Sequence, residues 1–100
     1  MKREMNLEDK YFNLIKEGNK QVEVRLYDVK RRALNIGDII TFNNRKTNEK
    51  IDCLIKDLKQ YNSLELLLTE VDTTSEELLS FYTKEEMDKY GLLAIHIELV

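Results

Sequence analysis

Three charged residues in one short segment are the first candidates for chemistry. Lys20 follows Gly18 by two positions, and Glu23 and Arg25 are themselves two positions apart. An ammonium or a guanidinium binds phosphate groups, whereas a carboxylate accepts hydrogen bonds from the edge of a base or an amide. Residues 18–25 therefore predict a binding site for a polar, anionic ligand.

The pattern around this segment predicts the elements that must position it. Apolar residues at helical spacing predict a helix over residues 8–17, which Gly18 would end. Over residues 20–27 apolar and polar residues alternate, which predicts a half-buried strand with Glu23 and Arg25 on its polar face. Their Cα atoms would then lie about 6–7 Å apart. They can bind one ligand together, or form a surface ion pair that contributes only about 0–1 kcal/mol.

An aromatic residue and a cationic run follow on the same stretch of chain. Tyr27 shares the polar face of the predicted strand and can stack on a base, an interaction worth about 1–3 kcal/mol, although tyrosines in small barrels more often pack. Lys30, Arg31 and Arg32 suit sequence-independent contacts to phosphates. A solvated basic loop is the alternative interpretation of this run.

Two further residues with reactive side chains, Cys53 and His96, are weaker candidates for a functional role. Cys53 falls on the apolar face of a predicted strand, which predicts a buried and inert thiol. His96 alternates with the apolar residues of the last strand, which favours an ordinary surface or packing role. One cysteine and one histidine cannot supply the ligands of a structural zinc site. We expect no metal and no cofactor.

Alternating residues predict further strands, and capping patterns predict short helices. The strands cover residues 3–7, 39–42, 50–60 and 93–99. One helix follows Ser63, a second covers residues 75–81, and a third begins at Thr83 and ends at Gly91. Glu86 completes a capping box with Thr83.

The order of these elements predicts how the strands pair. The strand over residues 20–27 is followed by strands over 39–42 and 50–60, which together suggest an antiparallel meander. The last strand, over residues 93–99, can close a barrel and so remove an exposed edge. A chain of 100 residues with no linker fits one domain, residues 1–100.

The charge changes sign along the chain. Residues 1–60 hold 14 basic and 10 acidic side chains, whereas residues 61–100 hold 2 and 9, within a net charge of −3. A protein that is acidic overall can still attract an anion through a local positive field. There is no apolar run of membrane-spanning length and no apolar signal-peptide core after Met1, so we expect a cytoplasmic protein with no membrane contact.

The ordered set of motifs resembles the ASCH domain of the PUA-like superfamily. The resemblance rests on Phe12 and Ile15 before Gly18-Asn19-Lys20, on residues 22–28, on Arg31-Arg32 with residues 36–42, and on Tyr82 and Tyr90-Gly91 before the last strand. It implies an α+β, mainly β fold: a small PUA-like β-barrel of about five to six mostly antiparallel strands with three to four short flanking helices. It also implies a basic cleft beside Gly18-Asn19-Lys20 that binds RNA or a nucleotide-like ligand.

The resemblance also raises a catalytic alternative. Some ASCH-like proteins are amidohydrolases acting on N4-acetylcytidine, in which a lysine, a threonine and a glutamate cooperate. Lys20 matches the lysine and Glu70 is a loose candidate for the glutamate, but Glu23 occupies the threonine position. A carboxylate cannot replace a hydroxyl nucleophile without a change of mechanism, although Glu23 is a possible general base in another hydrolytic scheme. Binding without turnover is therefore favoured over hydrolysis.

A third hypothesis assigns function to the acidic C-terminal part of the chain. Its predicted helices carry the acids Asp72, Glu76, Glu77, Glu85, Glu86 and Asp88. Such a surface suits a protein-interaction module, although helix surfaces are commonly acidic. A monomer is the favoured state.

Overall fold

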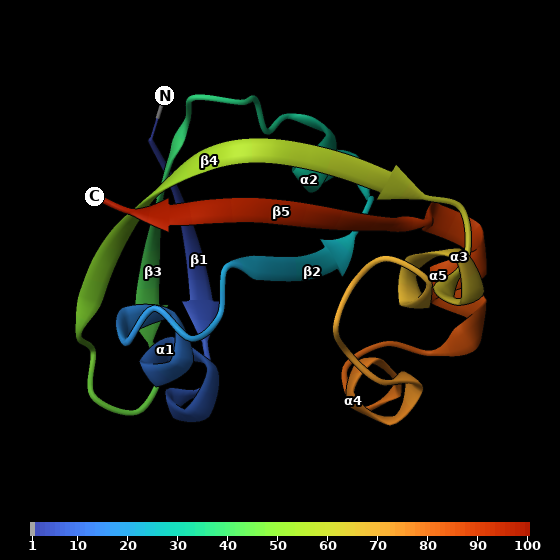
Figure 1. Cartoon of the computed structure of the whole chain (residues 1–100), viewed down its shortest axis with the longest axis horizontal. Helices are drawn as coiled ribbons and strands as arrows, with labels where there is room; N and C mark the ends of the chain where they lie inside the picture. The colour runs from blue at the N-terminus through green and yellow to red at the C-terminus, as the bar shows by residue number, and fades with distance from the viewer. Residues whose placement is uncertain (1) are drawn as a thin grey trace. The chain divides into compact units, whose positions relative to one another are not determined.

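The computed structural model describes residues 2–100 as strands and short helices (Figure 1). The strands are β1 Lys2–Leu7, β2 Val22–Leu26, β3 Ile39–Asn44, β4 Lys50–Tyr61 and β5 Leu92–Leu99. The helices are α1 Asp9–Lys16, α2 Val29–Arg32, α3 Leu64–Leu68, α4 Ser75–Leu79 and α5 Lys84–Tyr90. The predicted α+β, mainly β fold is confirmed. Within the described residues the helices number five, because the basic run Lys30, Arg31 and Arg32, which was considered as a loop, belongs to α2.

The five strands found in residues 2–100 form one mixed sheet in the order β1-β3-β4-β5-β2. β1 pairs with β3 in parallel, and β3 pairs with β4 in antiparallel. The predicted meander is correct for β3 and β4 and wrong for β2, which lies at the end of the sheet next to β5. Alternation identifies a strand but not its partner. Backbone bonds from Ile97 N to Gln21 O (2.9 Å) and from Tyr27 N to Gly91 O (3.0 Å) flank this unpredicted pairing.

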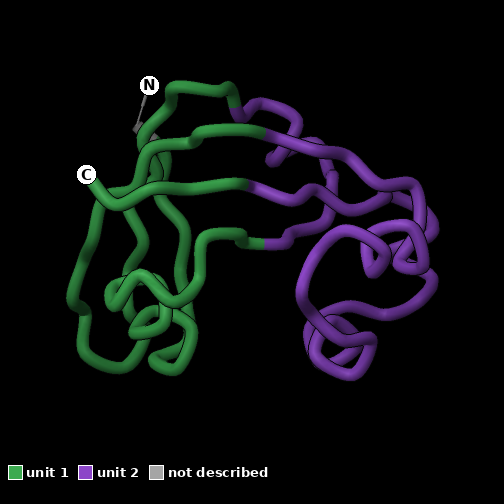
Figure 2. Tube along the Cα trace, in the orientation of Figure 1, with its two compact units in different colours: residues 1–23, 35–57, 96–100 green, residues 24–34, 58–95 purple. Residues whose placement is uncertain are grey.

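The chain divides into two compact units (Figure 2). The first unit comprises residues 1–23, 35–57 and 96–100, and the second comprises residues 24–34 and 58–95. Strands β2, β4 and β5 each contribute residues to both units.

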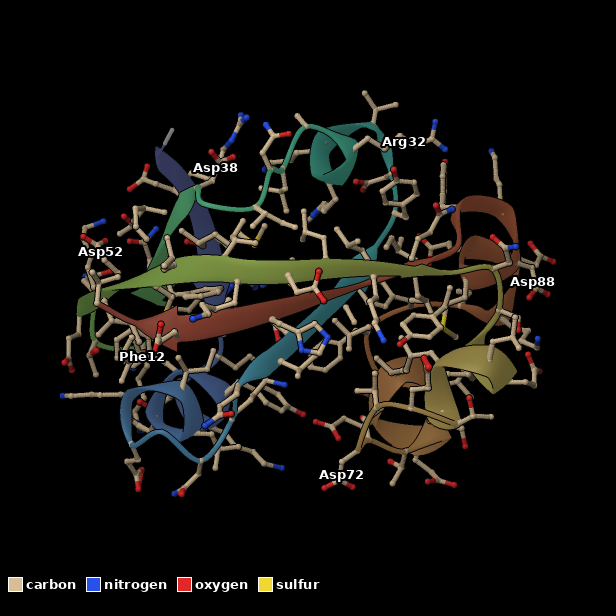
Figure 3. The ribbon with its side chains drawn as sticks, turned by 45° about the horizontal axis from the view of Figure 1, so that its top comes forward. Phe12, Arg32, Asp38, Asp52, Asp72 and Asp88 are labelled. Carbon is tan, nitrogen blue, oxygen red and sulfur yellow. The ribbon has the colours of Figure 1, made fainter. Side chains whose placement is uncertain are left out.

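The first unit contains α1 with strands β1 and β3 and the adjoining part of β4. Phe12 and Ile15 of α1 are almost fully buried, as their helical spacing predicts, together with Ile40 and Phe42 of β3. At the start of β3, the Asp38 carboxylate accepts a hydrogen bond from the Asn35 amide at 3.0 Å (Figure 3). The apolar core of this unit thus fixes the end of α1, where Gly18 follows.

The second unit contains α2 to α5, and its helices begin at residues that the sequence identifies. Ser63 caps α3, and Thr83 and Glu86 form the predicted capping box of α5. α4 ends at Leu79, two positions before the predicted end at Phe81. Gly91 terminates α5 with a φ of 76°.

Candidate functional site

Lys20 is placed by the way in which α1 ends. Gly18 adopts a φ of 80°, in the left-handed region that suits glycine just after a helix. The amides of Asn19 and Lys20 then both donate to the carbonyl of Leu14, at 2.9 and 3.1 Å. These bonds hold the loop against the last turn of α1, so the position of Lys20 is set by backbone interactions rather than by its own side chain.

The ammonium of Lys20 lies near a carboxylate and an aromatic ring of the first unit. Its Nζ lies 3.6 Å from Oε1 of Glu23 and 5.9 Å from the centre of the Tyr11 ring. The side chains of Lys20 and Glu23 are only 22% and 10% exposed. This pair is therefore better shielded from water than an ordinary surface ion pair. The sequence assigned Tyr11 to the helix, and no local pattern predicts its approach to Lys20.

The burial of Glu23 differs from the prediction. We expected Val22, Val24 and Leu26 to face inward, but Glu23 and Leu26 are the buried residues of β2, whereas Val22 and Val24 are partly exposed. A carboxylate is costly to bury unless it is paired, and Lys20 supplies a counter-charge. The strand therefore does not show the simple alternation that its sequence predicts.

A partly open cavity of about 400 Å³ lies beside the loop, and its lining comes from the first unit alone. The residues that decide its chemistry are Gly18 and Lys20 from the loop, Cys53 and Lys56 from β4, and His96 and Glu98 from β5. Lys56 and Glu98 form an ion pair at 3.3 Å. Both lysines of the cavity are thus paired with carboxylates, so the cavity combines positive groups with hydrogen-bond acceptors.

The other predicted binding residues lie in the second unit. The Arg31 guanidinium donates to the Asp28 carboxylate at 2.9 Å, and Asp28 also caps α2 by accepting from the Arg31 amide. Arg32 lies over the Tyr27 ring, with 5.2 Å from the guanidinium carbon to the ring centre (Figure 3). Lys30 is exposed and Arg25 is partly buried. One ring face of Tyr27 is thus covered by a cation, and a base that stacks there must displace Arg32.

Glu70, the loose candidate for a catalytic glutamate, belongs to a different unit from Lys20 and Glu23. Glu70 accepts a hydrogen bond from the Tyr61 hydroxyl at 2.8 Å in the second unit, whereas Lys20 and Glu23 belong to the first unit.

Burial raises the pKa of the Cys53 thiol to about 11, and the charge of Asp52 acts in the same direction. The prediction of a buried thiol is confirmed, and a neutral thiol is a poor nucleophile.

Metal-ligand clusters and membrane-spanning helices are both absent from the described part of the chain. No three His, Cys, Asp or Glu side chains gather into a metal-binding group within residues 2–100. Among the helices of that same range, none combines the length and the apolar character needed to cross a bilayer.

Comparison with known proteins identifies the family. A model of the ASCH domain matches residues 5–100, so the chain belongs to the ASCH domain family of the PUA-like superfamily. The crystal structure of hypothetical protein PH0355 is 37% identical, with a TM-score of 0.84 over 100% of both chains. The solution structure of protein PF0455 from Pyrococcus furiosus is 34% identical, with a TM-score of 0.74 over 100% of this chain and 98% of that one. No curated protein matches.

Proposed function

We propose that this protein binds single-stranded RNA or a nucleotide-like ligand and seats one nucleotide unit in the cavity beside Gly18-Asn19-Lys20. The observation that carries the proposal is the cavity itself, which is bounded by Gly18 and Lys20 and measures about 400 Å³. Sites for small ligands usually span about 300–1,000 Å³ and combine apolar walls with a few placed polar groups. A single nucleotide suits that range.

The lining offers chemistry for each part of a nucleotide. Apolar side chains of Ile15, Val22 and Ile97 provide surface for the flat faces of a base. Lys20 and Lys56 provide ammonium groups for a phosphate or a ribose hydroxyl. Membership of the ASCH family supports a nucleic-acid ligand.

The second unit offers a separate set of contacts to the phosphate backbone. Lys30 and Arg32 are exposed, whereas Arg31 is held by Asp28 and must exchange that partner for a phosphate. We propose Lys30 and Arg32 as sequence-independent phosphate contacts. Arg25 on β2 and Tyr27, which directly follows β2, are further members of the set.

Titration with short single-stranded RNA tests the proposal. We expect an eight-nucleotide RNA to shift the amide NMR signals of residues 18–23 and of the cavity strands β4 and β5. The variant Lys20→Ala should weaken binding by about tenfold, since one good charged contact is worth about 1.4 kcal/mol.

The variant Lys46→Ala is the matched control. Lys46 is an exposed lysine of the β3–β4 turn in the first unit and does not line the cavity, so its loss changes the net charge equally. If saturating RNA leaves the cavity signals unmoved, or if both variants weaken binding to the same extent, the proposed site is wrong.

A further inference from the structure

The imidazole of His96 has a buried nitrogen without a hydrogen-bond partner among the described residues. Its Nε2 atom is buried and makes no hydrogen bond with any residue that the structure describes. Buried polar atoms in folded proteins are almost always paired, so each exception calls for a physical reason. Leaving this nitrogen unpaired lowers the stability of the fold.

The location of His96 suggests the reason. The residue forms part of the wall of the cavity beside Lys20, on strand β5. The other charged or titratable side chains of that wall are Lys20, Cys53, Lys56 and Glu98. Lys56 and Glu98 pair with each other, and Lys20 pairs with Glu23. The Nε2 atom of His96, in contrast, can still form a hydrogen bond with a ligand.

We propose that His96 hydrogen-bonds the uncharged heterocycle of a nucleoside bound in this cavity, and so acts as the residue that reads the base. This inference rests on the proposed function and names the part of the ligand that enters the cavity. A base edge presents both donors and acceptors, and a neutral imidazole has one of each. Because the torsion about the Cβ–Cγ bond of histidine is broad, a small rotation of the ring brings Nε2 to a ligand that enters.

The balance of charge in the cavity favours a base over a bare anion. Lys20 and Lys56 each lie within 4 Å of a carboxylate oxygen, at 3.6 and 3.3 Å. Each carboxylate offsets the positive field that a free phosphate would meet. A nucleoside instead gains from apolar contact along its ring and from a hydrogen bond at its edge.

Two substitutions of His96 separate recognition from packing. His96→Phe keeps a ring of similar size but removes both nitrogens, and His96→Gln keeps a polar group near the position of Nε2. We expect His96→Phe to bind its best ribonucleoside at least tenfold more weakly, with an unfolding temperature equal to or above that of the wild type. His96→Gln should recover part of the lost affinity.

The ligands for this test are uridine, cytidine, adenosine, guanosine and inorganic phosphate, measured by calorimetry beside the eight-nucleotide RNA. Unchanged nucleoside affinity in His96→Phe, with loss in Lys20→Ala, overturns the role of His96 and leaves the proposed function standing. If the wild-type protein binds RNA but no nucleoside, the role of His96 is likewise overturned and the proposed function still stands. If neither RNA nor any nucleoside binds the wild-type protein, the proposed function itself fails. Phosphate binding equal to nucleoside binding also overturns the inference.

Discussion

At the scale of single residues, Glu23 sets the charge around Lys20, the lysine of the proposed binding site. Its carboxylate lies 3.6 Å from the ammonium and is 10% exposed, so it is an effective counter-charge. Such a pair restrains Lys20 and at the same time lowers its attraction for phosphate. The proposed binding at this site would therefore depend on an acid as much as on the lysine.

Substitution of Glu23 by glutamine tests this control. Glu23→Gln removes the charge and keeps the shape, so we expect uridine 5′-monophosphate to bind several-fold more tightly than to the wild type. The fold should lose about 1–3 kcal/mol of stability, because a shielded charged contact is broken. Glu49→Gln, which removes an exposed partner of Lys16, is the control for net charge. Weaker nucleotide binding in Glu23→Gln would contradict this role.

Cys53 predicts a dependence of stability on alkaline pH. Burial raises the pKa of its thiol to about 11 from an ordinary value of 9.0. A group whose pKa is higher in the folded state favours folding below its ordinary pKa and loses that contribution as the pH rises to the folded value. Between about pH 9 and about pH 11 we therefore expect stability to fall more in the wild type than in Cys53→Ala. Urea unfolding across this range measures the difference, and parallel curves would refute it.

Residue identity alone predicted some of the site and missed the rest. Lys20 and Glu23 were identified from their types and spacing, but their mutual pairing and the burial of Glu23 depend on how the end of α1 meets β2. His96 was interpreted as an ordinary histidine, because strand parity does not reveal a cavity formed with residues distant in the sequence. The unpaired nitrogen is a property of the folded surroundings and leaves no local signal.

At the scale of elements, local signals were reliable and distant pairings were not. The capping box of Thr83 and Glu86 operates within one helical turn, so the sequence contains all of it. β2 was recognised as a strand but was assigned the wrong neighbour, since its partner β5 is far along the chain. α2 was missed because a helix of four residues offers too short a periodic pattern, although Asp28 caps it.

Two glycines that follow helices give an element-scale prediction. Gly18 and Gly91 have similar φ values of 80° and 76°, but an added Cβ meets nothing within 4 Å at Gly18 and lies 2.9 Å from the Tyr61 carbonyl oxygen at Gly91. Gly91 also has a ψ of −178°, a combination that is essentially confined to glycine. We expect Gly18→Ala to cost about 1 kcal/mol and Gly91→Ala about 3 kcal/mol or more.

Chemical denaturation of the two variants measures this difference. Because both substitutions add one methyl group after a helix, each is the matched control of the other. Equal losses of stability would show that neither the extended ψ of Gly91 nor the contact with Tyr61 adds to the cost.

At the scale of the whole molecule, the distribution of charge is more informative than the net charge of −3. Basic residues are concentrated in residues 1–60, which include Lys20, Lys30 and Arg32. The assignment of residues 1–100 to one domain stays a prediction. Strands β2, β4 and β5, which run through both compact units, are consistent with it.

Salt dependence of RNA binding tests the contribution of the basic residues. The logarithm of the binding constant should fall linearly with the logarithm of salt concentration, with a slope of about −0.7 for each phosphate neutralised on a single strand. We expect Lys30→Ala to reduce the magnitude of the slope by about 0.7, and Lys46→Ala to leave it unchanged. Fluorescence anisotropy at four salt concentrations is sufficient to measure it. A slope near zero in the wild type would exclude phosphate contacts.

The cavity has a consequence for how the protein is made. Its walls come from residues 15–22 on one side and from residues 96–99 on another, with Cys53 and Lys56 between them in the sequence. A nascent chain that has not yet released residues 96–99 from the ribosome therefore lacks part of this cavity, whatever else has folded. The proposed ligand binding would then begin only after β5 has been synthesised and has taken its place beside β2.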